Sequence, residues 1–117
     1  MTSVFFETWR MKLRENEKQA LQALKKRIQE EFSLLDFRLF GSKARQNSSP
    51  ESDIDVMIMI EKSNPEIEAR LDDIVFDINL EHDTFISTVI FSRWEIEEGP
   101  MGESPIYKSI QREGIAF

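Results

Sequence analysis

The chain has 117 residues, of which 40% are hydrophobic, and a formal net charge of −7, with no cysteine and one histidine. This length predicts a single domain over residues 1–117 with a modest core. The composition excludes disulfides, thiolate metal sites and, because His82 stands alone, a multi-histidine zinc site. No apolar run reaches about 18 residues and no signal-peptide layout is visible, so we expect a soluble cytoplasmic protein without membrane contact.

The charge is unevenly distributed along the chain. Residues 1–45 carry ten Lys/Arg and six Asp/Glu, whereas residues 46–117 carry five and sixteen. The acidic total argues against DNA or RNA binding, because surfaces that neutralise phosphates are basic. The basic first part leaves room for a nucleotide phosphate, although a solvated helix face is the more common meaning of such a pattern.

The first predicted element is a helix over residues 5–32. Apolar residues recur in it at helical spacing: Ala20, Leu21, Leu24, Ile28 and Phe32. The wholly polar stretch 14–17 predicts a break, with Asn16 as the N-cap of a second helix. The part before this break holds three aromatic residues, which fit either a core stripe or a partner-binding face: Phe5, Phe6 and Trp9.

Two strands that lie next to each other in a sheet are predicted next. Residues 34–40 form the first, followed by a helical turn at 42–46 and a loop at 47–52. Residues 53–61 form the second strand. Its continuous apolar run, residues 56–60, predicts a buried central position in a sheet.

The rest of the chain alternates helix and strand again. Asn64 would cap a helix from residue 65 to about 80, and a third strand would run from residue 82 or 83 to 92. Ser92 would cap a short helix over 93–98. A break at 99–102 would precede a last helix, which Ser104 and Pro105 start and which runs to about residue 113. This order implies an α/β (α+β) sandwich, a small mixed sheet flanked by helices.

Chemistry concentrates where the first two strands meet. Gly41 can adopt backbone angles closed to other residues, so a strand can turn sharply there into a helix. Ser42 suits an N-cap, and free N–H groups at the start of a helix bind anions. Asp53 and Asp55 fall two residues apart and therefore point to one face of the second strand. Two such carboxylates repel unless a cation lies between them, so the pattern predicts a divalent-metal site facing a phosphate-binding turn.

The alternative for Asp53 and Asp55 is the polar start of a strand, with both carboxylates in solvent. The adjacent apolar run argues against this alternative, since burial near a charge is costly unless that charge is paired or binds a metal.

The two motifs together resemble the nucleotidyltransferases of the DNA polymerase beta superfamily, which carry Gly-Ser, a short loop and Asp-x-Asp on the next strand. The similarity is closest to the minimal nucleotidyltransferases, whose turn often reads G-S-x-A-R-G. Here residues 41–46 read GSKARQ, so Gln46 departs from that pattern. The resemblance is strongest over residues 38–58 and extends to the closing segment at 105–114. It implies a nucleotidyltransferase fold.

The resemblance also implies transfer of a nucleoside monophosphate from a nucleoside triphosphate such as ATP to a hydroxyl, with a two-metal Mg²⁺ site. Asp53 and Asp55 match the family's first two metal ligands, which implies that they act in catalysis. Gly41 and Ser42 match the family's turn that holds the β- and γ-phosphates. Lys43 and Arg45 could add a positive charge to this turn, or they could equally be surface charges.

The family places a third carboxylate inside a later strand, but residues 84–89 read TFISTV and hold no acid. Asp83, at the predicted start of that strand and on the face of Ser87, is the catalytic candidate. The alternative for Asp83 is a solvent charge at the end of the strand. If Ser87 takes the position of the acid, metal binding survives while turnover falls.

Small members of the family commonly pair with a helical HEPN-type ribonuclease toxin as its antitoxin, and some adenylylate that partner on a tyrosine. The resemblance therefore implies an antitoxin that binds such a toxin, with residues 105–117 and the N-terminal aromatic residues as candidate contacts. Two alternatives remain open: a module that neutralises the toxin by contact alone, and transfer to a small molecule such as an aminoglycoside. The sequence does not fix the oligomeric state.

Overall fold

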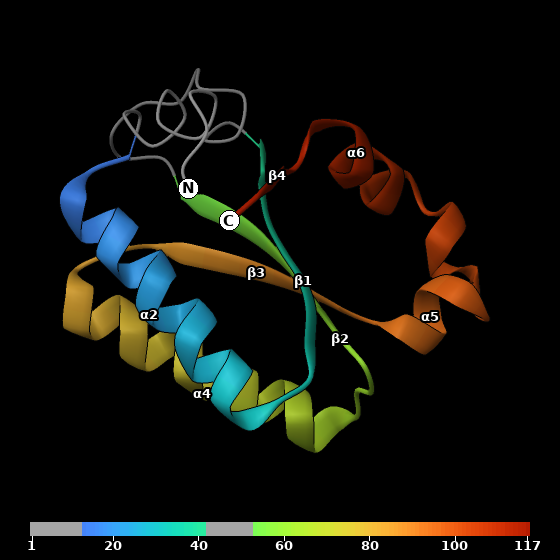
Figure 1. Ribbon diagram of the computed structural model, residues 1–117, viewed down its shortest axis with the longest axis horizontal. Coiled ribbons are helices and arrows are strands. Elements are labelled where there is room, and N and C mark those ends of the chain that lie inside the picture. The colour runs from blue at the N-terminus through green and yellow to red at the C-terminus, as the bar shows by residue number, and fades with distance from the viewer. Residues whose placement is uncertain (1–12, 42–52) are drawn as a thin grey trace.

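The computed structural model describes residues 13–41 and 53–117. Figure 1 shows the elements in chain order, and their bounds are as follows. Helix α2 (Glu15–Glu31) leads into strand β1 (Leu34–Phe40), and strand β2 (Ile54–Ile60) into helix α4 (Pro65–His82). Strand β3 (Ile86–Ser92), helix α5 (Arg93–Glu97), the 3₁₀ helix η1 (Pro100–Glu103), helix α6 (Pro105–Glu113) and strand β4 (Ile115–Ala116) follow.

The strands form one mixed sheet in the order β3-β2-β1-β4. Strand β1 pairs antiparallel with β2 and with β4, whereas β2 pairs parallel with β3. The predicted pairing of the first two strands and the central position of β2 are therefore confirmed. Strand β4 was missed, because two residues are too few to show an alternating pattern. Its pairing is continued by Phe117, whose N–H donates to Phe37 O at 3.0 Å.

Helices cover both faces of the sheet, as Figure 1 shows. Helices α2 and α4 lie on one side, and α5, η1 and α6 lie on the other. Side-chain alternation along β2 explains these two layers. Val56 and Ile58 point into the core under α2 and α4, while Met57 packs with Phe91 and Ile110 on the opposite face. A strand covered on both faces reads as a continuous apolar run, which is the pattern of residues 56–60.

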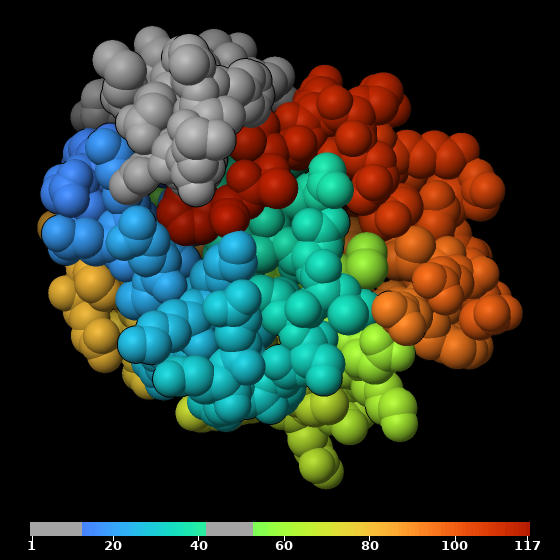
Figure 2. All heavy atoms as spheres, in the orientation of Figure 1, coloured from blue at the N-terminus to red at the C-terminus, as the bar shows by residue number. Residues whose placement is uncertain are grey.

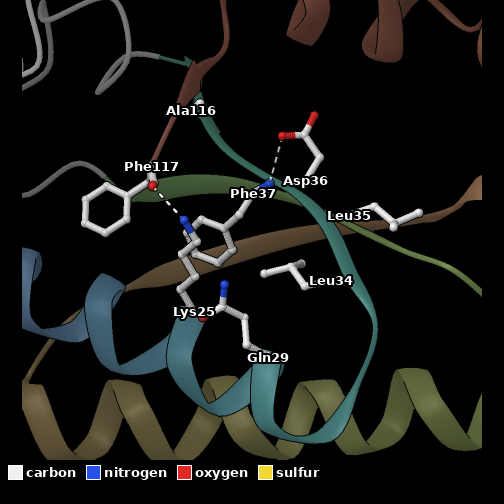
Figure 3. Close-up of a pocket in the computed structure, with 8 residues that line it drawn as sticks. All are labelled: Lys25, Gln29, Leu34, Leu35, Asp36, Phe37, Ala116 and Phe117. Atoms are coloured by element: carbon white, nitrogen blue, oxygen red, sulfur yellow. Dashed lines mark hydrogen bonds between the residues drawn. The ribbon is translucent and has the colours of Figure 1, made fainter. Parts of the chain in front are cut away.

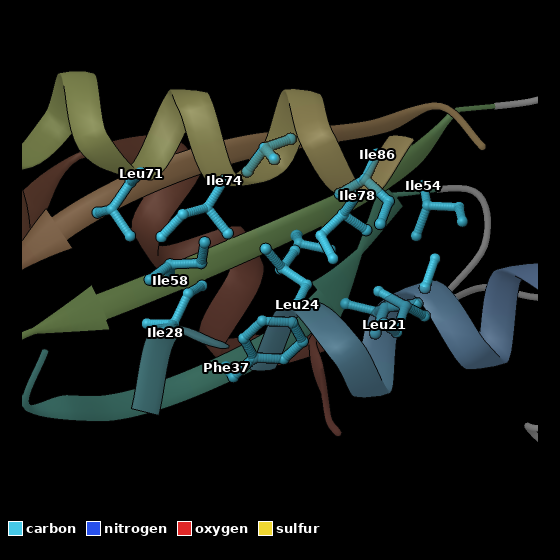
Figure 4. Close-up of a cluster of buried hydrophobic side chains, with 14 of the residues drawn as sticks. Leu21, Leu24, Ile28, Phe37, Ile54, Ile58, Leu71, Ile74, Ile78 and Ile86 are labelled. Atoms are coloured by element: carbon cyan, nitrogen blue, oxygen red, sulfur yellow. The ribbon is translucent and has the colours of Figure 1, made fainter. Parts of the chain in front are cut away.

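The main core lies between the α2–α4 layer and the sheet (Figure 4). The apolar faces of the two helices supply its fully buried side chains: Leu21, Leu24, Ile28, Leu71, Ile74 and Ile78. Their spacing of three or four residues places them on one stripe of each helix. The outer faces are largely polar, with Phe76 and Leu80 of α4 as exposed apolar exceptions. Among the described residues, no helix combines the length and the apolar character needed to cross a membrane.

Three side chains begin the helices at the predicted positions. Asn64 Oδ1 accepts from Ile67 N at 2.8 Å at the start of α4. Ser92 Oγ accepts from the main chain of α5 at 3.2 Å, and Ser104 Oγ from that of α6 at 3.3 Å. Each cap satisfies an N–H group that has no partner inside its helix.

The second helix predicted after a break in the polar stretch 14–17 begins slightly earlier than expected. Arg14, just before it, is extended, and α2 begins at Glu15 and continues through residues 16 and 17. The N–H of Arg14 donates to Glu17 Oε1 at 2.9 Å, which satisfies a main-chain group just before the helix. Asn16 is not an N-cap. Its side-chain amide donates to the carbonyls of His82 and Asp83 at 2.9 and 3.1 Å, and so joins the start of α2 to the end of α4. The predicted helical residues 5–12 lie outside the described residues.

Helices α2 and α4 are also joined by an ion pair on their outer surface. Arg70 donates from Nε and Nη2 to the two carboxylate oxygens of Glu31, at 2.8 and 2.7 Å. These hydrogen bonds lower the pKa of Glu31 and raise the pKa of Arg70. Both side chains are exposed, so water and salt screen the pair and the core remains the main source of stability.

The predicted start of the third strand at His82 or Asp83 is wrong, because β3 begins at Ile86. His82 is the last residue of α4, and Asp83 caps that helix with φ 55° and ψ 54°. Aspartate is one of the few residues besides glycine that tolerate this left-handed conformation. The helix therefore ends by a sharp turn, and the chain does not become extended until Ile86.

Replacing Leu24 by alanine tests the position of the core. Leu24 has no exposed surface, so we expect Leu24→Ala to lower the free energy of unfolding by about 2–5 kcal/mol through the cavity it leaves. Leu80→Ala is the matched control, since Leu80 is 69% exposed on the outer face of α4. We expect the control to change stability by less than about 0.5 kcal/mol in urea denaturation. Equal losses in the two variants would contradict this placement.

Candidate functional site

Asp55 lies in the central strand β2, opposite Phe40 of β1 and Ser87 of β3. Residues that pair across a sheet point to the same face. Asp55, Phe40 and Ser87 therefore share the face of the sheet that carries Met57 and the smaller core cluster. Asp55 is half-buried, two residues before that cluster begins, and Ser87 is exposed. The fold therefore holds the carboxylate on its most constrained strand while leaving it within reach of solvent.

Gly41 directly follows β1 and has φ +72°, in the left-handed region that favours glycine. A Cβ at this position would overlap the Oδ2 atom of Asp55. Glycine is therefore required here twice, once by the backbone conformation and once by the close approach of the carboxylate. This contact brings the Gly-Ser motif and the Asp-x-Asp motif together in space.

Asp53 is exposed and lies just before β2, which begins at Ile54 and ends at Ile60. The predicted strand over 53–61 is thus one residue too long at each end. Ile54 N donates to Phe85 O at 2.9 Å, and this hydrogen bond fixes the start of β2 against the segment before β3. Asp53 therefore lies at the same end of the sheet as Asp55, one residue outside it.

The remaining residues predicted to bind the nucleotide lie outside the described residues. They are Ser42, Lys43 and Arg45, which fall within residues 42–52. The helical turn predicted at 42–46 and the loop predicted at 47–52 fall there too. Their roles stay predictions.

Ser87, and not Asp83, is the residue of this region that lies in register with Asp55. Asp83 is exposed at the end of α4, where its carbonyl accepts a hydrogen bond from α2. In the part of the chain that the structure describes, no three His, Cys, Asp or Glu side chains form a group that could hold a metal. Asp83 therefore does not join Asp53 and Asp55 in a three-carboxylate cluster, and its catalytic role stays a prediction.

The two aspartates still fit a magnesium ion that binds together with a nucleotide. Carboxylate oxygens are hard ligands, and Mg²⁺ is usually held by one or two protein carboxylates plus phosphate oxygens and water. The space that Gly41 leaves for Asp55 Oδ2 fits the same arrangement, because it sets this carboxylate beside the predicted phosphate turn.

A cavity of about 210 Å³ lies elsewhere, between α2, the start of β1 and the C-terminal segment (Figure 3). Lys25 Nζ donates across it to Phe117 O at 2.8 Å, and Asp36 accepts from Phe37 N at 2.9 Å. Figure 2 shows the same region from outside, with the red C-terminal segment beside blue α2 and teal β1. The cavity lies toward the start of β1, whereas Asp55 pairs with Phe40 at the end of β1. The cavity is therefore separate from the aspartate site.

The chain belongs to the nucleotidyltransferase domain family, whose model matches residues 21–116. The matched range includes Gly41, Asp53, Asp55 and Ser87. The four-stranded mixed sheet flanked by helices is consistent with the nucleotidyltransferase fold predicted from the sequence. This membership supports nucleotidyl transfer as the general activity, and the family generally uses a nucleoside triphosphate and a divalent metal. A search of curated proteins found no match.

Replacing Gly41 by alanine tests the contact between the two motifs. We expect Gly41→Ala to lose about 1–2 kcal/mol of stability from its left-handed backbone. We also expect weaker Mg²⁺-dependent binding of a non-hydrolysable nucleoside triphosphate, because the new Cβ displaces Asp55. Gly99→Ala is the control, since Gly99 has φ −97° and lies in another segment. Unchanged nucleotide binding by Gly41→Ala in calorimetry would contradict the contact.

Proposed function

We propose that this chain transfers AMP from ATP to a hydroxyl of a helical HEPN-type toxin, and so acts as the antitoxin of that protein. In this proposal residues 1–117 work as one domain in the cytoplasm, and Asp53 and Asp55 hold Mg²⁺. One observation carries the proposal. The carboxylate of Asp55 lies against the bare backbone of Gly41, which sets a metal ligand beside the predicted phosphate turn.

The roles of the residues follow from their chemistry. Main-chain N–H groups of the turn after Gly41 would hold the β- and γ-phosphates, as free N–H groups at a helix start commonly do. Asp53 and Asp55 would bind Mg²⁺, which in such sites offsets the charge of the triphosphate and stabilises the attacking and leaving oxygens. Ser87 would lie beside Asp55, where its hydroxyl can hydrogen-bond to a ligand but adds no negative charge.

The acceptor would come from a second protein, because the described part of the site is open. Asp53 and Ser87 are both exposed, so a hydroxyl carried by a partner can approach them. The predicted contact segment 105–117 is partly used by the fold: Tyr107 packs edge-on against Phe91, with ring centroids 5.6 Å apart. Ile106 remains 42% exposed and is the apolar contact that this segment offers. The candidates Phe5, Phe6 and Trp9 lie outside the described residues.

A second candidate function is neutralisation of the toxin by contact alone. The observation that favours it is the position of Ser87, which stands opposite Asp55 where a third carboxylate would complete the metal site. A protein retained only for contact would not need to keep Asp53 and Asp55 beside a buried strand. We therefore place enzymatic transfer first.

Calorimetry tests the metal site. We expect a non-hydrolysable ATP analogue to bind more tightly with Mg²⁺ than without it, and we expect the double change Asp53→Asn, Asp55→Asn to abolish that difference. Asp72→Asn, at an exposed position on α4, is the matched control and should leave the Mg²⁺ effect unchanged. Equal affinity with and without Mg²⁺ in the natural sequence would contradict the proposed site.

Mass measurement of the partner tests the transfer itself. After incubation of the two proteins with ATP and Mg²⁺, we expect the mass of the toxin to rise by one AMP. Asp53→Asn or Asp55→Asn should abolish this shift, because the loss of such a group commonly costs a factor of about 10²–10⁴ in rate. If the double variant neutralises the toxin fully and no adduct forms, the contact-only function is correct.

The same assay tests the predicted role of Asp83. If Asp83 accepts the proton of the attacking hydroxyl, Asp83→Ala should slow transfer by a similar factor without weakening Mg²⁺-dependent nucleotide binding. Transfer at the natural rate would show that Asp83 has no part in the reaction.

The same assay with an added aminoglycoside tests the alternative acceptor. An AMP adduct on the aminoglycoside, with none on the toxin, would identify a small-molecule acceptor.

A further inference from the structure

Strand β3 forms one outer edge of the sheet, since it pairs with β2 on one side only. Ile54 N donates to Phe85 O at 2.9 Å, and Ile54 is in register with Ile86. In a parallel ladder every second residue of a strand bonds to the neighbouring strand, and it bonds to the two residues that flank its partner there. The odd-numbered residues of β3 therefore direct their main-chain groups to β2, and the even-numbered residues direct theirs outward.

Side chains satisfy the outward groups at both ends of this edge. Asn79 of α4 accepts from Ile86 N at 2.8 Å through Oδ1 and donates to Ile86 O at 3.1 Å through Nδ2. At the other end, Ser92 N donates to Glu95 Oε1 at 3.2 Å. These bonds confirm that even-numbered residues face outward, and they close the ends of the edge to a further strand.

The middle of the edge is open. Within residues 13–41 and 53–117, the main-chain N–H and C=O groups of Thr88 and Ile90 have no hydrogen-bond partner, and both residues are partly exposed. Proteins usually protect such an edge with a charged residue, a proline or a bulge. Strand β3 reads ISTVIFS and has no charge or proline. Residues 88–90 thus offer two donors and two acceptors at the spacing of an extended chain.

The flank of α4 beside this edge is apolar and acidic. Phe76 lies three residues before Asn79, one turn away and on the same side of the helix, and is 60% exposed. Asp72 lies one further turn back and is exposed. From Leu71 to His82 the helix carries four acidic residues and no lysine or arginine.

We propose that residues 88–90 bind an extended segment of a partner protein by strand addition, with an apolar side chain against Phe76 and a basic one near Asp72. Strand addition follows from the open main-chain groups, and the chemistry of the segment follows from the flank. A second copy of this chain fits less well, because pairing two β3 edges would bring two acidic α4 helices together. The proposal does not depend on nucleotidyl transfer.

A short peptide can serve as the probe. We suggest an acetylated and amidated peptide that carries valine and lysine in turn at every second position, with threonine between them, so that both side chains lie on the face of α4. It is added to the full chain at low salt. Hydrogen exchange followed by NMR should show the amides of Thr88 and Ile90 protected on addition, while exposed amides elsewhere do not change. The same peptide with its central valine N-methylated should protect less, because it has lost a main-chain donor. No protection at either amide, or equal protection by both peptides, would overturn the proposal.

Variants of the chain test the same surface from its own side. Thr88→Pro removes an outward N–H that β2 does not use, and proline is tolerated at such edge positions. We expect it to abolish peptide binding, whereas Thr88→Val, which keeps the N–H, should bind normally. Asp72→Asn should weaken binding by up to about fivefold at low salt.

Two further results would overturn the choice of occupant. A valine–glutamate peptide that binds as well as the valine–lysine peptide would refute the basic partner. A concentration-dependent dimer in sedimentation that disappears in Thr88→Pro would show that a second copy fills the edge. If Thr88→Pro fails to fold by circular dichroism, the N-methylated peptide still decides the main-chain contact.

Discussion

The site depends on the close approach of Asp55 to the main chain at Gly41. A central strand covered on both faces is a costly place for a charge, because burial removes the water that stabilises it. The fold accommodates the charge by placing it near the beginning of β2, before the smaller core cluster starts at Met57. The absent side chain of Gly41 then gives the carboxylate room beside the predicted phosphate turn. Any larger residue at position 41 would disturb both the packing and the carboxylate that we propose as a metal ligand.

The turn between α4 and β3 is the second organising feature, and Asn79 holds it together. Its side chain binds both main-chain groups of Ile86, and its Oδ1 also accepts from Thr84 Oγ1 at 2.9 Å. These bonds set where β3 begins. Through the parallel register they also decide that Ser87 stands opposite Asp55. One polar side chain on α4 thus shapes both the outer edge of the sheet and the neighbourhood of the site.

Features decided by nearby residues were predictable from the sequence, and those decided by distant partners were not. The caps at Asn64, Ser92 and Ser104 were predicted correctly, because each bonds within a few residues of itself. The start of β3 was not, since it depends on Asn79 and on the left-handed turn at Asp83. Strand β4 was missed because it exists only by pairing with β1. In the same way the Asp-x-Asp pattern was visible directly, whereas the neighbour of Asp55 on β3 required the strand register.

A serine opposite Asp55 would affect two tasks of a nucleotidyl-transfer site differently: the binding of Mg²⁺ with a triphosphate, and the removal of the proton from the attacking hydroxyl. Binding of Mg²⁺ with a triphosphate needs few protein ligands, because phosphate oxygens and water complete the shell, and Asp53 and Asp55 can meet that need. Accepting the proton of an attacking hydroxyl needs a group whose pKa suits the task, and the hydroxyl of Ser87 is a poor acceptor at neutral pH. The lack of a third carboxylate would therefore lower the rate of transfer more than the affinity for Mg²⁺ and the triphosphate. Slow transfer to one tightly bound partner is compatible with such a site, because a long-lived complex gives the reaction time, whereas rapid turnover of a small diffusing acceptor is not.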